Sequence, residues 1–286
     1  MSPSKLYTPV DIIADMNYAD PNLGEIDGNT FKQRYLNIHD EHTRKMTIHD
    51  IRTREHEFTL KKNGFQFVTL PKKDRHEKDP EKVEAEYYPE LAELLKNMTG
   101  ADHVHLFNHC VRAALTTEKE GDSGQMHIPE LNGPSGHPHC DYSSIHEDQK
   151  RTAMILPIPE ESKKLIADGS RFFFIGTWKP IKTLERNPLC VCDVNTVPDS
   201  DYKIKVSMRR YGKGSNAVIS HAAAEEQHQW YYMNGMTPEE IVIFAGYDSK
   251  QDEPGWRCPH NSFEIPGTEH LPPRESIECR ALAIWE

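Results

Sequence analysis

Short apolar or alternating stretches recur along the chain, and Gly, Pro, Asn or Asp residues separate most of them. This pattern is typical of strands joined by turns. Few segments between the stretches have helical spacing, so we expect a mainly β protein with flanking helices, a jelly roll or barrel rather than a doubly wound sheet. The predicted strands are 102–108, 171–178, 189–193, 229–233, 240–245 and 277–284.

The first half of the chain contains one hairpin pattern and one helix pattern. Residues 58–60 and 64–70 resemble two strands joined by a turn at 61–64, because its Asn-Gly pair is a strong hairpin signal. Apolar residues at helical spacing predict a helix over about 80–98, with Asp79 placed to cap it. We expect this helix to pack on one sheet.

The remaining segments complete a single predicted domain spanning 1–286. Residues 1–45 lack a clear period and are expected to form an irregular covering segment, so that the β core occupies 46–286. The stretch 116–138 is rich in Gly, Glu, Ser and Pro and is predicted to be a loop. Because a loop of this length is often a lid or binding loop, we expect it to cover a site.

A histidine and an aspartate at the end of that loop are the first candidates for chemistry. On an extended strand His139 and Asp141 point the same way, and together they supply two ligands of a 2-His-1-carboxylate metal site. The motif alone is weak: His-x-Asp/Glu occurs three times, and 16 His with 45 Asp and Glu would produce about two or three copies by chance. Its position after the long loop favours this copy.

The third ligand should lie late in the chain, because a jelly roll brings distant strands side by side. His260, within the sequence Cys-Pro-His-Asn-Ser-Phe, is the candidate. His137 competes with it, since His137 shares the parity of His139, but Pro138 favours a loop position for His137. The copy of the motif at 146–148 lies in a polar run and is expected at the surface.

Two arginines beyond the third candidate ligand could bind an anion. Arg274 and Arg280 have even spacing, so they lie on one face of a strand. The planar, permanently charged guanidinium group suits a carboxylate partner. Either arginine could instead pair with a neighbouring acid such as Glu275 or Glu278.

The composition excludes several other classes of protein. The net charge is −11 and basic residues are interspersed with acids, which argues against nucleic-acid binding. Apolar runs stay shorter than the roughly 20 residues that span a bilayer, and the first residues lack the apolar core of a signal peptide. Six dispersed cysteines do not form a disulfide-scaffold pattern. We therefore expect a cytoplasmic protein with reduced thiols that binds neither nucleic acid nor membranes.

Several motifs resemble the fungal hydroxylase/desaturase family that includes cephalosporin methoxylase-related and meroterpenoid endoperoxide-forming enzymes. The resemblance runs from about Met46 to the C-terminus. The motifs are HCD at 139–141, PHNSF at 259–263, PRESIECRALAI at 273–284, FNHCVR at 107–112, GTWKP at 176–180 and HQWYYMNGMTPEEIVIFAGYDS at 228–249. The resemblance implies a double-stranded β-helix (jelly roll, cupin-like) that uses Fe(II), with 2-oxoglutarate and O2 as cosubstrates.

The resemblance also implies roles for individual residues. His139, Asp141 and His260 would be the iron ligands, and an arginine of PRESIECR would bind the distal carboxylate of 2-oxoglutarate. Spacing from His260 favours Arg274 over Arg280, without deciding between them.

Further matching positions suggest a wall near the cosubstrate or substrate. Arg112 and Trp178 match residues that the family keeps, and Lys179 is a third candidate. At Gly176 and Lys179 the chain departs from the Asn and Arg that are common in the family.

The function that follows is oxidation of an unactivated C–H bond in a fungal specialised metabolite, by hydroxylation, desaturation or endoperoxide formation. We expect a small-molecule substrate, with an apolar terpenoid or meroterpenoid favoured. The alternative is a non-catalytic cupin-like protein that only binds metal. The sequence is compatible with a homodimer.

Overall fold

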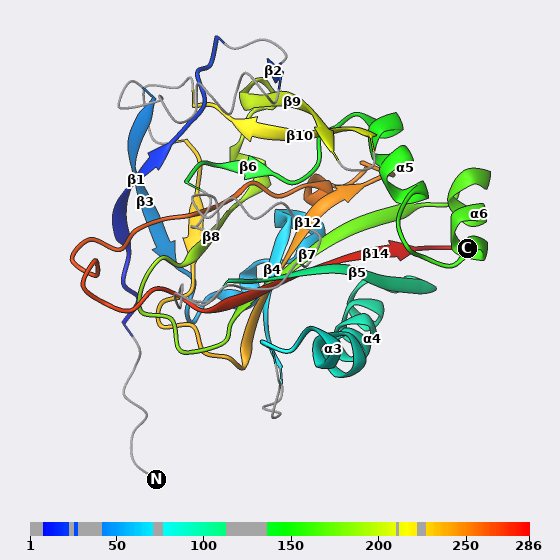
Figure 1. Ribbon diagram of the computed structural model, residues 1–286. Helices are drawn as coiled ribbons and strands as arrows, with labels where there is room; N and C mark the ends of the chain where they lie inside the picture. Colours follow the sequence, from blue (N-terminus) through cyan, green and yellow to red (C-terminus); the bar gives the residue numbers. More distant parts are fainter. Residues whose placement is uncertain are drawn as a thin grey trace.

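The computed structural model describes residues 8–22, 26–27, 42–70, 77–112, 136–209, 212–221 and 227–286 (Figure 1). These ranges form two β-sheets, with helices beside the five-stranded sheet and at one end of the sheets. The strands are β1 (Ile12–Asn17), β2 (Ile26–Asp27), β3 (Thr43–Asp50), β4 (Phe65–Thr69), β5 (His103–Arg112), β6 (His139–Cys140), β7 (Phe172–Pro180), β8 (Leu189–Cys192), β9 (Tyr202–Arg209), β10 (Gly212–Ile219), β11 (Trp230–Tyr232), β12 (Glu240–Asp248), β13 (His260–Ser262) and β14 (Ser276–Ile284).

The helices are fewer and shorter than the strands. The α-helices are α2 (Leu60–Asn63), α3 (Pro80–Lys82), α4 (Tyr88–Thr99), α5 (His146–Met154) and α6 (Glu160–Asp168). Short 3₁₀ or π turns are η1 (Glu55–Glu57), η2 (Val83–Tyr87), η4 (Val194–Thr196), η5 (Asp199–Asp201) and η6 (Pro254–Trp256).

The six strands predicted between residues 102 and 284 are confirmed. They correspond to β5, β7, β8, β11, β12 and β14. The nine-stranded sheet has the order β1-β3-β11-β8-β13-β6-β10-β9-β2, and the five-stranded sheet has the order β4-β12-β7-β14-β5. Neighbours far apart in sequence, such as β6 and β13, pair within a sheet, as the jelly-roll prediction requires.

The segment predicted to be irregular at 1–45 contains a strand, so that prediction was wrong in part. Strand β1 pairs antiparallel with β3 at the edge of the nine-stranded sheet. Ala14 and Met16 are buried while Ile13 and Asp15 are exposed, which is the alternation of a half-buried strand. The signal was weak because the strand is only six residues long and combines Ala and Asp with its few large apolar residues.

The predicted hairpin at 58–70 was also wrong. Residues 60–63 form the helical turn α2, and Gly64 ends it with a φ of 85°, donating its N–H to the carbonyl oxygen of Leu60 at 3.1 Å. The following strand, β4, pairs with β12 instead of with residues 58–60. The Asn-Gly pair supplies a left-handed residue, which suits a helix C-cap as well as a hairpin turn.

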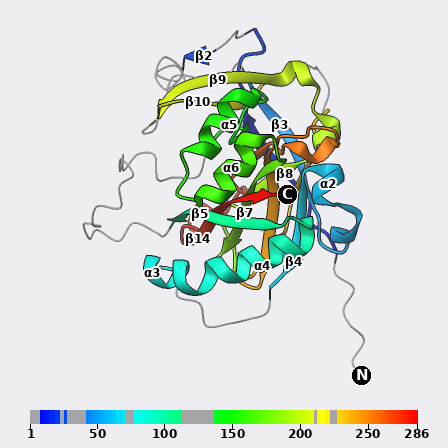
Figure 2. The same cartoon turned by 90° about the vertical axis from the view of Figure 1, so that its right-hand side faces the viewer.

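The predicted helix at 80–98 is confirmed as a continuous helical segment from α3 through η2 to α4. The carboxylate of Asp79 accepts hydrogen bonds from the N–H groups of Glu81 and Lys82, and Gly100 ends the segment with a φ of 69°. Figures 1 and 2 show α4 running beside β5 and β14. Its Leu91 and Leu95 are fully buried against this sheet.

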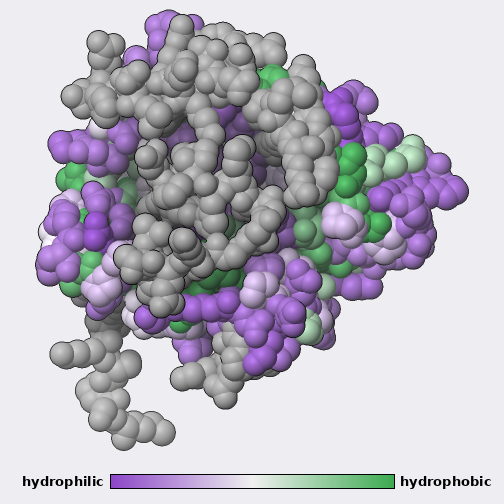
Figure 3. All heavy atoms as spheres, in the orientation of Figure 1, coloured by the Kyte–Doolittle hydropathy of each residue, from purple (hydrophilic) through white to green (hydrophobic). Residues whose placement is uncertain are grey.

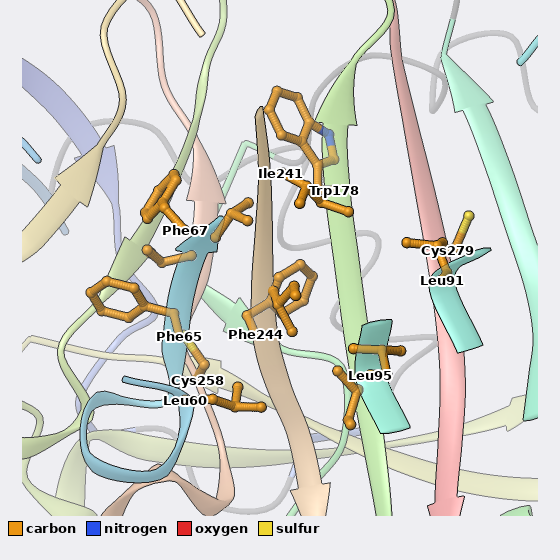
Figure 4. Close-up of a cluster of buried hydrophobic side chains, with 14 of the residues drawn as sticks. Leu60, Phe65, Phe67, Leu91, Leu95, Trp178, Ile241, Phe244, Cys258 and Cys279 are labelled. Atoms are coloured by element: carbon orange, nitrogen blue, oxygen red, sulfur yellow. The ribbon is translucent and has the colours of Figure 1, made fainter. Parts of the chain in front are cut away.

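The largest core cluster joins both faces of the five-stranded sheet. Figure 4 draws part of it, with Phe65 and Phe67 on β4, Phe244 on β12, and Leu91 and Leu95 on α4. Phe65, Leu91 and Leu95 are fully buried, and complete burial of such side chains contributes about 1.5–3 kcal/mol each. This packing makes the five-stranded sheet a rigid support for the residues that face the other sheet.

Helices α5 and α6 pack together at one end of the sheets, and α5 also lies against β10. On the side seen in Figure 3, apolar residues are visible near these helices among largely hydrophilic neighbours. Ile155, which follows α5, is 44% exposed. Among the described residues, no helix is both long and apolar enough to cross a membrane.

Candidate metal centre

Three metal-binding side chains meet where β6 and β13 pair. His139 opens β6, Asp141 follows that strand, and His260 opens β13 directly opposite His139. The potential ligand atoms of all three residues lie within 4.8 Å of one another. The centroids of the two imidazole rings are 4.4 Å apart. The antiparallel register therefore brings together the two parts of the predicted triad.

Both histidines have the same ring orientation relative to the backbone. Nδ1 of His139 lies 2.9 Å from the carbonyl oxygen of His137, and Nδ1 of His260 lies 3.1 Å from that of Cys258. A carbonyl oxygen can only accept, so each Nδ1 donates a proton and Nε2 of each ring is the atom left to bind a metal. Burial, with His260 acting in the same direction, lowers the pKa of His139 to about 4. Its imidazole is therefore neutral at physiological pH, as a metal ligand must be.

The two carboxylate oxygens of Asp141 contact different neighbours. Oδ1 lies 4.0 Å from Nε2 of His139, whereas Oδ2 accepts a hydrogen bond of 3.1 Å from Nε of Arg280. Burial alone would raise the pKa of Asp141, but Arg280, followed by His260 and His139, holds it well below its usual value. The carboxylate is therefore ionised, and two imidazole rings beside one carboxylate form a donor set suited to Fe(II).

Arg274 forms a separate, anion-binding arrangement. Its Nη1 donates to the carbonyl oxygen of Asn187 at 2.7 Å and to Oγ of Ser262 at 2.8 Å. Nε of Arg274 and Oγ of Ser276 are buried and have no hydrogen-bond partner among the described residues. Burial, and then the charge of Arg112, lower the pKa of Arg274 to about 9. A buried cation beside a second cation and an unpaired hydroxyl group is an environment that favours an anion.

The predicted wall residues separate into two groups. Trp178 is buried with its ring centroid 5.4 Å from Cζ of Arg274, and Arg112 lies on β5 opposite Ser276. Lys179, in contrast, lies on the other face of β7, where its fully buried ammonium group contacts Glu77 at 2.7 Å. Strand alternation makes this inevitable once Trp178 faces Arg274. Lys179 is therefore a structural ion pair and not part of this wall.

An aromatic residue that the sequence did not single out as a site residue contacts the triad. The ring of Phe244 lies 4.6 Å from that of His260 and covers the backbone of Gly176, where a Cβ atom would lie 2.4 Å from the ring. Sequence spacing could not identify this contact because it depends on the pairing of β12 with β7. The backbone carbonyls of residues 137 and 258 were missed for a similar reason, since any residue carries one.

Three other features considered in the sequence are His137, His146 and the loop at 116–138. The ring of His137 is 5.2 Å from that of His139, but His137 is outside the group of potential ligands. His146 donates or accepts at 2.9 Å with the hydroxyl group of Tyr247, away from the triad, as expected for a residue without a ligand role. The loop predicted at 116–138 lies outside the described residues up to position 135.

Comparisons with known proteins agree with this architecture. A family model described as Oxidoreductase/YMDC permease-like domain matches residues 16–284. The hydroxylase/desaturase efuI of Hormonema carpetanum is 34% identical over 281 residues, covering 94% of this chain and 92% of that protein. The alpha-ketoglutarate-dependent dioxygenase phiK of Fungal sp. (strain ATCC 74256) is 34% identical over 245 residues, covering 85% and 84%.

A solved structure is similar over almost the whole chain. The iron and alpha-ketoglutarate-dependent endoperoxidase NvfI superposes with a TM-score of 0.72 at 24% identity, covering 97% of this chain and 98% of that one. This likeness establishes the jelly-roll fold, and the two relatives at 34% identity establish the kinship. The chain therefore belongs to the fungal Fe(II)/2-oxoglutarate-dependent dioxygenases and hydroxylase/desaturases of secondary metabolism.

Proposed function

We propose that this protein is an Fe(II)- and 2-oxoglutarate-dependent dioxygenase in which His139, Asp141 and His260 hold the metal. The observation that supports this most directly is the convergence of one potential ligand atom from each of the three residues within 4.8 Å, while Nδ1 of both histidines and Oδ2 of Asp141 are engaged elsewhere. When bound, the metal and cosubstrate supply the O2-dependent oxidising chemistry. The protein supplies ligands, orientation and shielding from water.

Arg274 is the residue that we assign to the distal carboxylate of 2-oxoglutarate. Its unpaired Nε and the nearby Oγ of Ser276 offer two donors, and its contacts with Asn187 and Ser262 hold the guanidinium in place. Arg280 is already engaged by Asp141 and Glu278, which leaves it less suited to this task. Trp178 would cover the cosubstrate from the side of β7.

The reaction that we infer is oxidation of an unactivated C–H bond in a fungal secondary metabolite. The two relatives are named as a hydroxylase/desaturase and as a dioxygenase, and the similar structure as an endoperoxidase, which agrees with this class of reaction. The aromatic rings of Phe244, Trp178 and Phe174 favour a bulky apolar substrate of terpenoid or meroterpenoid type. We propose that residues 1–286 form one catalytic domain.

Anaerobic titration tests the metal and cosubstrate assignments together. Fe(II)-loaded protein should develop a visible metal-to-ligand absorption on addition of 2-oxoglutarate, with a midpoint that reports its affinity. His139→Ala protein should show no such band, because it lacks one ligand of the metal. A non-catalytic metal-binding protein would give no band in either case, and that result would contradict the proposal.

A further inference from the structure

One charged side chain of the five-stranded sheet, that of Arg280, contacts the candidate metal ligand Asp141. Arg280 lies on β14, its Nε donates to Oδ2 of Asp141 at 3.1 Å, and its Nη2 lies 2.5 Å from Oε1 of Glu278. All three side chains are mostly buried, with exposed fractions of 29%, 17% and 16%. Arg280 therefore links an acid of its own strand to the carboxylate that follows β6.

The position of Arg280 depends on a row of residues across the sheet. Phe244 on β12, Gly176 on β7 and Arg280 on β14 are directly opposite one another in register. Gly176 has no side chain, and the ring of Phe244 occupies the space above it. The row thus places an aromatic ring beside His260 and a guanidinium group beside Asp141.

We propose, on the basis of the function assigned above, that Arg280 is a positioning residue that fixes Asp141 as a ligand through Oδ1 alone. Oδ2 is occupied by the guanidinium group, while Oδ1 faces the ring of His139. A carboxylate held by one oxygen cannot turn to offer both oxygens to a metal. This keeps coordination positions available for the cosubstrate and O2.

Glu278 is the second acidic partner of Arg280. It lies two residues from Arg280 and so projects from the same face of β14. Without Glu278, the charge of Arg280 would offset that of Asp141 and repel an incoming divalent cation. With Glu278, the group of three residues keeps one net negative charge beside the metal position. Arg280 can therefore orient Asp141 without lowering the attraction of the site for a cation.

A different role for Arg280 predicts the opposite result. If the guanidinium were only a counter-ion that shields Asp141 until metal arrives, it would compete with the metal. Its removal would then strengthen metal binding. If it positions Asp141, its removal weakens metal binding, and loss of an outer partner of a metal ligand typically reduces affinity by about 10- to 100-fold.

The test uses Co(II) as a spectroscopic substitute for Fe(II) in the metal-free full-length protein. Co(II) affinity and the intensity of the Co(II) visible absorption would be measured for wild type, Arg280→Met, Arg280→Lys and Glu278→Gln. Arg52→Met is the matched control, because Arg52 forms a two-pronged pair with Glu240 at 2.7 and 2.9 Å, outside the metal centre. Circular dichroism and melting temperature report the folding of each variant.

We expect Arg280→Met to weaken Co(II) binding by about 10- to 100-fold and to lower the absorption per bound metal, since a two-oxygen carboxylate raises the coordination number. Arg280→Lys should recover part of the loss, and Glu278→Gln should cause a smaller loss. The Arg52→Met variant should bind Co(II) as wild type does. If Arg280→Met fails to fold, the Lys and Gln variants carry the test.

Unchanged or tighter Co(II) binding by the folded Arg280 variants, with unchanged absorption, would overturn the positioning role. Wild-type or tighter binding by Glu278→Gln would overturn the role of Glu278. A failure of the proposed function itself would give a different result. In that case the wild-type protein would bind Co(II) no better than His139→Ala protein, and both inferences would fall together.

Discussion

The orientation of both candidate histidine ligands is set by backbone carbonyl groups. Nδ1 of His139 and Nδ1 of His260 each donate to the carbonyl oxygen two residues earlier in the chain. This arrangement leaves Nε2 of each ring to face the centre of the group, and Nε2 of His139 lies 4.0 Å from Oδ1 of Asp141. The site is therefore pre-organised, and its loss through mutation should affect chemistry more than folding.

We predict that His139→Ala, Asp141→Ala and His260→Ala each abolish 2-oxoglutarate turnover, because each removes one of three ligands. The proteins should remain folded, as circular dichroism would show. His146→Ala is the control: its ring contacts Tyr247 and not the triad, so activity should persist. Turnover at the wild-type rate by any of the three ligand variants would rule out the triad.

The two arginines should respond differently to substitution by lysine. Arg274→Lys removes the planar donor pair that we assign to the carboxylate, so the 2-oxoglutarate concentration for half-maximal turnover should rise about tenfold or more. Arg280→Lys should leave this concentration nearly unchanged when the metal is saturating, because its partner is Asp141. Steady-state kinetics at saturating Fe(II) separates the two. Equal dependence in wild type and Arg274→Lys would move the cosubstrate assignment elsewhere.

At the scale of elements, the strands that are buried on both faces gave the clearest signal in the sequence, whereas β5, which is only partly buried, was predicted from its alternating pattern. β7 is buried at every position and β12 at all but its first, so their apolar runs were unmistakable. β13 was not predicted because it is three residues long, and β1 was not predicted because half of it is polar and exposed. The signal for a strand is its burial, and short or edge strands carry little of it.

The three candidate ligands could be selected from the sequence, while the residues that surround them could not. The ligands carry distinctive chemistry at a recognisable spacing. The partners of those ligands, Phe244 and Arg280, are ordinary residue types that become relevant only through the register of β12, β7 and β14. That register depends on packing against the whole sheet, which no local pattern encodes.

The row across these three strands leads to a prediction at Gly176. Gly176→Ala would place a Cβ atom 2.4 Å from the ring of Phe244, forcing the ring toward His260. Overpacking of this kind costs about 1–3 kcal/mol, so we expect a lower free energy of unfolding and weaker Co(II) binding. Urea denaturation and Co(II) titration would measure the two effects.

A second substitution identifies the cause of this effect. Gly176→Ala combined with Phe244→Leu should be less destabilised than the sum of the two single variants, because the smaller side chain relieves the clash. Gly136→Ala is a suitable control, since nothing lies within 4 Å of the position of its Cβ. Strict additivity of the two changes would show that the ring of Phe244 is not the obstacle.

At the scale of the whole molecule, a buried polar cluster ties the end of β1 to the rest of the nine-stranded sheet. Nε2 of His228 lies 3.0 Å from Oδ2 of Asp201, and its Nδ1 lies 3.2 Å from the hydroxyl group of Tyr18. The ring of His221 is 4.4 Å away. Burial, followed by the proximity of His221, lowers the pKa of His228 to about 4.

This cluster should make the stability of the metal-free protein depend on pH. As the pH falls below about 6.5, the unfolded chain takes up a proton at residue 228 while the folded chain does not, so folding loses up to about 3 kcal/mol by pH 4. Urea denaturation between pH 7.5 and 5 should show a smaller decrease for His228→Gln than for wild type. Identical slopes would show that His228 is not responsible.

The charge of the whole molecule and the lining of its centre together restrict the substrate. A net charge of −11 disfavours anionic substrates such as nucleotides, apart from the carboxylate that Arg274 and Arg112 would bind. Phe244 lies beside His260, and Phe174 is stacked on Tyr142, the residue after Asp141, with ring centroids 4.3 Å apart, so the side chains packed around the triad are largely aromatic. Such surface gains most from burying a large apolar body.

We therefore predict that 2-oxoglutarate and O2 consumption by the Fe(II)-loaded protein increases with polycyclic terpenoids and not with amino acids or nucleotides. Coupled oxidation of one compound in a panel, measured by mass spectrometry of the product, would identify the chemistry as hydroxylation, desaturation or endoperoxide formation. His139→Ala protein provides the background rate. Because the apolar lining and the acidic surface both oppose small charged substrates, strong coupling to an amino acid or a nucleotide would contradict the substrate class while leaving the metal centre intact.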